Sequence, residues 1–254
     1  MSLSELPPLD CHAHIAPDVT DPQIRGLNGA VVFAMTRSPA EASAAARRND
    51  AAIVWGYGAH PGITTALAAA TKDSVQHAVG QHALIGEIGL DRKSALAPQL
   101  AALDIILSLC TEQPLLLSLH STGRTSQLLD ALTRRPHPGA ILHWFNGTRA
   151  DIQRAITLDC YFSVNAAMTD ERLSWIPPNR LLPETDFPSS RRSTRASKPG
   201  DIAFLEQRIS ALLNQPVSDI RQLWYRNLAA LTNRAGVIPR LPPTLRDLLQ
   251  ELVT

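Results

Sequence analysis

Short apolar runs alternate with helix-like stretches along almost the whole chain, and this alternation restricts the possible folds more than any other feature. Most of the runs are continuous, as is typical of parallel strands that are covered on both faces. Ala- and Leu-rich stretches with a helical period lie between them. Strands are expected at residues 9–15, 30–36, 53–59, 83–88, 115–120, 140–145, 161–164 and 181–186. Helices are expected at residues 39–49, 64–80, 95–112, 124–135, 148–159, 169–176 and 201–213.

Eight strands alternating with helices in 254 residues predict an α/β fold of the (β/α)8 TIM-barrel type. A doubly wound open sheet is the structural alternative, but no glycine-rich phosphate loop follows the first strand. We expect a single barrel domain over residues 1–236 and a Pro-rich tail with a short amphipathic helix over residues 237–254. The leucines of that helix either pack on the barrel or dock a protein partner. They are Leu245, Leu248, Leu249 and Leu252.

The composition narrows the functional classes. The formal net charge is +1, so the chain as a whole does not indicate nucleic-acid binding, and any polyanion must be met by local charge. Three cysteines without a CxxC pair are typical of reduced thiols and argue against a zinc ribbon or a disulfide framework. The first residues lack the pattern of a signal peptide, and no apolar run is long enough to cross a bilayer. We therefore expect a cytoplasmic protein without a membrane segment.

The first and fourth strands carry residues of a kind that binds metal ions. His12 and His14 stand two apart, so they point to the same side of the first strand and could chelate one ion. Glu87 lies in the apolar stretch LIGEIGLD, where a lone acid is costly unless a positive charge waits for it. Because a carboxylate has two oxygens, Glu87 could bridge two metal ions.

Four other strands end in similar residues. His120 and His143 close the fifth and sixth strands, and Glu184 and Asp186 share one face of the eighth. His60 stands where the third strand meets its loop, either as a turn residue fixed before proline or as a hydrogen-bond donor to substrate. Barrel active sites are built at the carboxyl ends of the strands. Imidazole and carboxylate together suit Zn²⁺, Mn²⁺ or Fe²⁺, so these strands predict a metal-dependent site.

Basic residues gather in the loops that follow the strands. On the predicted active-site face they indicate an anionic substrate, although ordinary solvated charge is the alternative and several acids share this face. Trp144 and Phe145 directly follow His143, where they either form a stacking shelf for a base or belong to the core. The basic residues are Arg37, Arg92, Lys93, Arg124, Arg149, Arg191, Arg192, Arg195 and Lys198, and the acids are Asp18, Asp21 and Asp91.

Taken in order, the motifs resemble those of the TatD-related metal-dependent deoxyribonucleases, a family of amidohydrolase-like barrels. They are DCHAHI, GAHP, IGEIGLD, LSLHS, LHWFNGT, YFSVNA and LLPETDFP, within residues 9–235. The resemblance implies a (β/α)8 barrel that hydrolyses phosphodiester bonds of DNA with two divalent metal ions, commonly as a 3′→5′ exonuclease. The ions expected are Zn²⁺, Mn²⁺ or Mg²⁺. Single-stranded DNA or DNA ends are the implied partner of a monomeric enzyme.

The resemblance also implies a role for each site residue. The implied metal ligands are His12, His14 and Asp186 for one ion, His120 and His143 for the other, and Glu87 as the bridge. By the resemblance, Glu184 supports the ligands and His60 touches the scissile phosphate. On physical grounds, Asp186 can accept the proton of the attacking water as general base.

The loop HSTGRT departs from the His-Ser-Arg-Asp-Ala pattern of the family, and Arg124 is a candidate replacement for the lost arginine. We expect His60, Arg124, Arg191 and Arg192 to bind substrate. Two other functions stay open. One is a metal-dependent hydrolase of a small ester, lactone or cyclic amide. The other is a nuclease subunit recruited into a larger assembly, for example in anti-phage defence, with the C-terminal tail as its dock.

Overall fold

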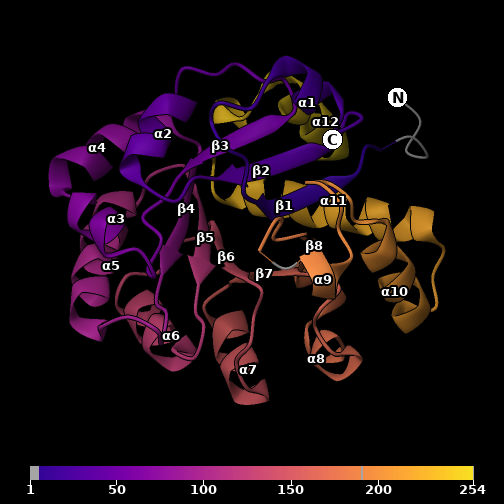
Figure 1. Ribbon diagram of the computed structural model, residues 1–254. Coiled ribbons are helices and arrows are strands. Elements are labelled where there is room, and N and C mark those ends of the chain that lie inside the picture. The colour runs from indigo at the N-terminus through magenta and orange to yellow at the C-terminus, as the bar shows by residue number, and fades with distance from the viewer. Residues whose placement is uncertain (1–5, 190, 254) are drawn as a thin grey trace.

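The barrel predicted from the alternating pattern is present in the computed structural model, which describes residues 6–189 and 191–253. Eight parallel strands pair in sequence order (Figure 1). They are β1 (Leu9–Ala13), β2 (Val31–Met35), β3 (Ile53–Tyr57), β4 (Leu84–Gly89), β5 (Leu116–His120), β6 (Ala140–His143), β7 (Tyr161–Val164) and β8 (Leu181–Pro183). Their side chains are buried almost throughout, because helices cover the outside of the barrel and side chains fill its interior.

The sheet nearly closes where β8 meets β1. Just beyond β8, the backbone N–H of Asp186 donates to the His12 carbonyl oxygen at 2.9 Å, and the His14 N–H donates to the Phe187 carbonyl oxygen at 2.7 Å. The buried Asp10 carboxylate reinforces this seam by accepting hydrogen bonds from the backbone N–H and the hydroxyl of Thr185. The backbone therefore holds two metal-ligand candidates, His12 on β1 and Asp186 after β8, beside each other.

The expected helices surround the barrel with some differences at their ends, and two short helices, at residues 21–25 and 191–194, were not expected (Figure 1). They are α1 (Asp21–Arg25), α2 (Pro39–Ala45), α3 (Thr64–Ala69), α4 (Lys72–Gln81), α5 (Leu96–Cys110), α6 (Thr125–Arg134), α7 (Arg149–Thr157), α8 (Asp170–Trp175), α9 (Arg191–Thr194), α10 (Ala203–Leu213), α11 (Val217–Arg234) and α12 (Pro243–Val253). Two 3-10 turns are η2 (Pro178–Arg180) and η3 (Ile238–Arg240). None of these described helices is both long and apolar enough to span a bilayer.

The single helix expected over 64–80 is divided into α3 and α4. Ala70 leaves the helical region with ψ at 58°, and the Thr71 hydroxyl then caps α4 by accepting from the Ser74 N–H. The apolar spacing continues across this break, so the period alone predicted one helix. The expected strands over 140–145 and 181–186 end early, at His143 and Pro183.

The leucine stripe of the C-terminal tail packs inward. Leu245 and Leu249 are fully buried and Leu248 nearly so, and α12 packs against α11. Leu252 is partly buried against the same core. Of the two interpretations of this stripe, packing on the barrel is the one observed. The division of the chain at residue 237 stays a prediction.

Candidate metal centre

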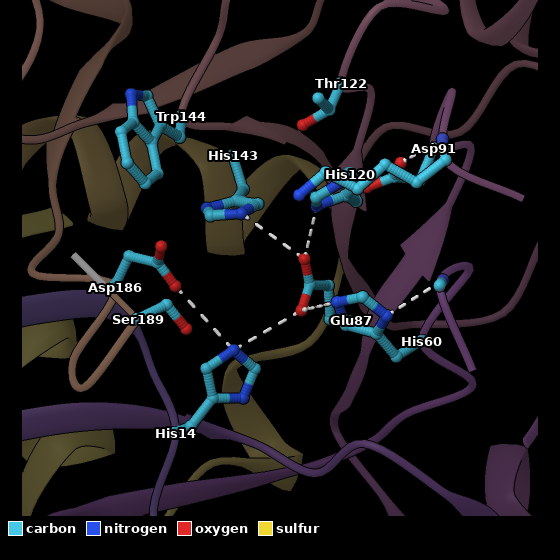
Figure 2. A pocket seen from close by; sticks show the side chains of 12 residues that line it. His14, His60, Glu87, Asp91, His120, Thr122, His143, Trp144, Asp186 and Ser189 are labelled. Carbon is cyan, nitrogen blue, oxygen red and sulfur yellow. Dashed lines mark hydrogen bonds and ion pairs between the residues drawn. The ribbon is translucent and has the colours of Figure 1, made fainter.

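Six of the predicted residues converge at the carboxyl end of the barrel, with Glu87 in the middle. The two carboxylate oxygens of Glu87 face different groups of histidines (Figure 2). Its Oε2 lies 3.3 Å from His14 Nε2 and 4.0 Å from His12 Nε2. Its Oε1 lies 2.5 Å from His120 Nδ1 and 3.4 Å from His143 Nε2. One carboxylate thus stands between two sets of nitrogen atoms.

Asp186 completes the group on the β1 side. Its Oδ1 lies 3.7 Å from His14 Nε2 and 3.9 Å from His12 Nε2. The backbone of Asp186 is left-handed, with φ at 48°, and that of Trp144 likewise, with φ at 36°. Non-glycine residues rarely adopt this conformation except where surrounding structure imposes it, commonly at binding sites.

The histidines are oriented by partners on their outer nitrogen atoms. His12 Nδ1 contacts Ser118 Oγ at 2.8 Å, and His14 Nδ1 contacts the Met35 carbonyl oxygen at 3.1 Å. A carbonyl can only accept, so His14 carries its hydrogen on Nδ1, and the lone pair on Nε2 faces Glu87 and Asp186 when the ring is neutral. Such outer contacts fix the tautomer and direction of metal-binding histidines.

Glu184 has the same orienting position toward His143. Its Oε2 lies 3.1 Å from His143 Nδ1 and accepts a hydrogen bond from Ser163 Oγ, while its Oε1 accepts one from Asn165 Nδ2. Glu184 therefore lies behind His143 and contacts its Nδ1, and its role in supporting a metal ligand stays a prediction.

His120 faces Glu87 with Nδ1 and not with Nε2. The partner of its other ring nitrogen is Asp91, to which no role was assigned from the sequence. Asp91 Oδ2 lies 3.0 Å from His120 Nε2, so Nδ1 is the nitrogen that faces Glu87. Asp91 is itself held by the Lys93 N–H and by Gln99, which binds both the N–H and the carbonyl of Asp91. The motif IGEIGLD could have indicated this role of Asp91, because it places a second acid four residues after Glu87, just beyond the end of the strand.

The close approach of β4 and β5 depends on a glycine. Gly89 has φ at 134°, and a Cβ at this position would lie 2.2 Å from the His120 carbonyl oxygen. The next residue, Leu90, donates its N–H to the same oxygen. A side chain at Gly89 would therefore displace His120 from its position beside Glu87.

The unsatisfied atoms of this cluster fit a cation. His12 Nε2 and Glu87 Oε2 are buried and form no hydrogen bond of good geometry within residues 6–189 and 191–253, although the Nε2 atoms of His14 and His60 lie 3.3 and 3.4 Å from Glu87 Oε2. Leaving such atoms unpaired is costly, whereas a divalent ion would use their lone pairs. Overlapping groups of ligand atoms lie within 4.8 Å of one another, including those of His12, His14 and Glu87, and those of His12, His143 and Asp186. Imidazole and carboxylate are suitable ligands for such ions.

The electrostatics of the two central acids differ. Burial disfavours ionisation of Glu87, but the charge and hydrogen bond of His120, with the contacts of His14 and His143, hold the pKa of Glu87 well below its usual value. Burial instead raises the pKa of Asp186 to about 7. A positive charge at this point would favour the ionised form of both.

His60 is placed as a donor. Its Nδ1 accepts a hydrogen bond from the Gly62 N–H at 2.9 Å, so the neutral ring carries its hydrogen on Nε2. Burial lowers the pKa of His60, which favours this neutral form. Nε2 lies 3.4 Å from Glu87 Oε2, on the wall of the pocket. In this geometry His60 can donate a hydrogen bond into the pocket, and its contact with substrate stays a prediction.

The pocket over Glu87 has a volume of about 380 Å³, and its rim includes Lys93, Thr122, Trp144 and Ser189 (Figure 2). The two aromatic residues after His143 have separate places. Trp144 lines the pocket, whereas Phe145 is buried and packs edge-on against Phe162 in the core.

Two of the arginines expected at the substrate do not line this pocket. Arg124 donates from Nε to the Asp91 carbonyl oxygen and from Nη2 to that of Ser94, so it braces the loop after β4. Arg192 is exposed on α9. The side chain of Arg191 lies outside the described part of the chain. Lys93 is the cationic side chain that the described residues bring to the rim.

Comparison with known proteins gives a consistent family. The family model described as TatD related DNase matches residues 9–233. A 3'-5' ssDNA/RNA exonuclease TatD from Enterobacter lignolyticus is 32% identical over 146 residues, which are 50% of this chain and 56% of that protein. Its counterpart from Shigella flexneri is 28% identical over 175 residues, which are 60% of this chain and 67% of that protein. The chain thus aligns with little more than half of the first relative's length.

Solved structures agree on the fold. The crystal structure of YJJV, a TatD homolog from Escherichia coli, superposes with a TM-score of 0.75 at 22% identity and covers 89% of this chain and 97% of that one. A hydrolase TatD family protein from Entamoeba histolytica gives a TM-score of 0.71 at 18% identity, over 88% of this chain and 97% of its own. At these identities the similarity establishes the barrel and no more.

Proposed function

The chain belongs to the TatD related DNase family, and on that premise we propose that it hydrolyses phosphodiester bonds of nucleic acid with divalent metal ions at the carboxyl end of its barrel. The observation that carries the proposal is the position of Glu87, whose two oxygens face two separate groups of histidines. Such a carboxylate is suited to link two cations, an arrangement used for phosphodiester hydrolysis.

The proposed ligands divide at Glu87. His12, His14 and Asp186 would hold one ion, His120 and His143 would hold a second, and Glu87 would contribute to both. When bound, such ions supply Lewis-acid chemistry: they lower the pKa of water and neutralise phosphate charge. Zn²⁺, Mn²⁺ and Mg²⁺ are the candidates.

Other residues of the site handle protons and substrate. Asp186 accepts the proton of the attacking water at a carboxylate oxygen, as a general base. Water oxygen then bonds to phosphorus and a P–O ester bond breaks, with the departing oxygen taking a proton from solvent. His60 donates its Nε2–H to a non-bridging phosphate oxygen. Lys93 contacts the backbone of the strand, and the Trp144 indole stacks on a base.

The substrate proposed is single-stranded DNA, cut from its 3′ end. The relatives named as 3'-5' ssDNA/RNA exonucleases support this polarity, and RNA is the natural second substrate to compare. The pocket rim supports it as well, because Lys93 and Trp144 offer a cation and an aromatic face to a single strand.

The experiment is hydrolysis of labelled single-stranded DNA and RNA by the purified protein with Mn²⁺, Mg²⁺, Zn²⁺ or a chelator. Glu87→Gln keeps the shape of the side chain but removes its charge. Glu112→Gln is the matched control, since Glu112 is exposed in the turn between α5 and β5 at the opposite end of the barrel. We expect metal-dependent shortening from the 3′ end by the native and control proteins and loss of activity in Glu87→Gln.

Intact DNA and RNA with every metal would refute the nuclease proposal. Lactones, small esters and cyclic amides would then be tested on the same preparations. The metal content of the inert protein would separate a different hydrolase from a protein without catalytic function.

A further inference from the structure

A second pocket, of about 650 Å³, adjoins the candidate metal centre and shares His14 with it. It is formed by the segment 14–27, which includes α1, together with Phe187, Lys198 and Pro199 after β8. Its volume is within the range of sites for small organic ligands. The proposed hydrolysis uses none of its residues except His14.

One wall of this pocket is apolar and includes an aromatic ring. Ile15 and Leu27 belong to a small hydrophobic cluster that is separate from the main core, and Val19, Ile24 and Phe187 pack against it. All five side chains line the pocket. A flat apolar group such as a nucleobase would bury its faces against this wall, with the Phe187 ring available for stacking.

The charged side chains that line the two pockets differ, so each pocket suits a different part of a nucleic-acid strand. Asp18 lines the second pocket, and so does Lys198, whose Nζ donates to the Gly26 carbonyl oxygen at 2.5 Å. The formal charges of Asp18 and Lys198 in the second pocket therefore sum to zero. The first pocket instead combines Lys93 with the proposed cation site. Phosphate groups are expected in the first pocket and an uncharged part of the strand in the second.

We propose that the second pocket holds the 3′-terminal nucleoside of the strand. This proposal rests on the proposed nuclease function and deepens it. With the scissile phosphate over Glu87, the terminal base lies against Phe187 and Ile24, and its free 3′-hydroxyl donates to the Asp18 carboxylate. The rest of the strand leaves past Lys93 and Trp144. Because the Gly26 carbonyl oxygen holds Lys198, a terminal 3′-phosphate would bring its negative charge against Asp18, so the pocket selects strands that end in a hydroxyl.

The test compares kcat/KM for one single-stranded oligonucleotide ending in a 3′-hydroxyl or a 3′-phosphate, using the native protein, Asp18→Asn and Asp21→Asn. Asp21 begins α1 and is exposed but does not line the pocket, so its variant is the matched control. Two unit charges in contact in water interact by about 1 kcal/mol, which corresponds to about fivefold. The native and control proteins should favour the 3′-hydroxyl by about fivefold or more, and Asp18→Asn should reduce that preference by about fivefold.

A 5′-phosphate should have no effect that depends on Asp18, because the 5′ end lies away from this pocket. Equal cleavage of both 3′ ends by the native protein, or an unchanged preference in Asp18→Asn, would overturn the assignment while leaving the nuclease function intact. Cleavage of circular single-stranded DNA at a comparable rate would also overturn it, since a circle has no terminal nucleoside. Failure to cut any oligonucleotide would remove the function on which the proposal rests.

Discussion

Asp91 Oδ2 lies 3.0 Å from His120 Nε2, and this contact makes His120 the histidine of the cluster that turns its Nδ1 toward Glu87. His12, His14 and His143 all turn Nε2 toward the same carboxylate and hold Nδ1 on outer partners. Asp91 therefore sets the direction of one proposed ligand without reaching the centre itself. Mutation of outer partners of this kind typically costs about 10- to 100-fold in metal affinity or activity.

We predict that Asp91→Ala weakens metal binding by about 10- to 100-fold, because His120 loses the group that orients it. Metal titration followed by calorimetry measures this effect directly, independent of any assay of activity. Asp104→Ala, at an exposed acid on α5, is the control. Equal affinities in the two variants would show that Asp91 does not position His120.

Glu184→Gln should lower the rate of hydrolysis by about 10- to 100-fold with a smaller effect on KM, since Glu184 orients His143 and the substitution keeps its shape. The comparison of kcat and KM separates this positioning role from substrate binding. Glu171→Gln, at an exposed acid in the first turn of α8, should behave as the native protein. An effect confined to KM would contradict the orienting role.

Removal of divalent metal should lower the thermal stability of the folded protein, because the described residues then offer the buried His12 Nε2 and Glu87 Oε2 no hydrogen bond of good geometry. An ion present at a hundred times its dissociation constant stabilises by about 2.7 kcal/mol. Melting curves with chelator, and after metal is returned, measure the shift. In Glu87→Gln the shift should be much smaller, and an equal shift there would place the stabilising ion elsewhere.

Trp144→Ala should raise KM for single-stranded DNA, by an amount that corresponds to about 1–3 kcal/mol for loss of stacking on one base. Trp144→Phe keeps an aromatic face and should recover most of the affinity. Direct binding of fluorescent oligonucleotide to each variant is the measurement. Equal losses in both variants would indicate that the indole acts through the shape of the loop and not through stacking.

Asp50→Asn should destabilise the protein at neutral pH by about 1–3 kcal/mol, because a partly buried network loses its charge. Asp50 accepts from Arg48 Nε at 2.7 Å and from Trp55 Nε1 at 2.8 Å, and Arg48 also holds the Pro17 and Val19 carbonyl oxygens.

The pH dependence of this effect has a definite sign. The Arg48 hydrogen bond holds the pKa of Asp50 below its usual value of 3.8. The extra stability is therefore present above pH 3.8 and is lost as the pH falls through the lowered pKa. Denaturant unfolding of both proteins across acid pH should show their difference shrinking, and a constant difference would contradict the ionic contribution.

Much of the fold and of the candidate site follows from local sequence. Continuous apolar runs separated by helical stretches specify parallel strands, and the carboxyl ends of such strands must meet at one end of a barrel. A histidine or acid at the end of six of these eight runs is then brought to the others by the topology itself. For this reason His12, Glu87, His120 and His143 could be placed together before any tertiary contact was known.

Only the tertiary structure decided how those side chains are used. The contact with Asp91 sets which ring nitrogen of His120 faces Glu87. The Gly62 N–H sets which ring nitrogen of His60 carries its hydrogen. Arg124 points away from the pocket because it donates to carbonyl oxygens of the loop after β4. Trp144 and Phe145 are adjacent in the sequence. The left-handed backbone at Trp144 nevertheless directs the Trp144 ring to the pocket and the Phe145 ring to the core. Periodicity reports which face of an element is buried. The partner of each polar atom is set by residues far away along the chain, and only folding brings these together.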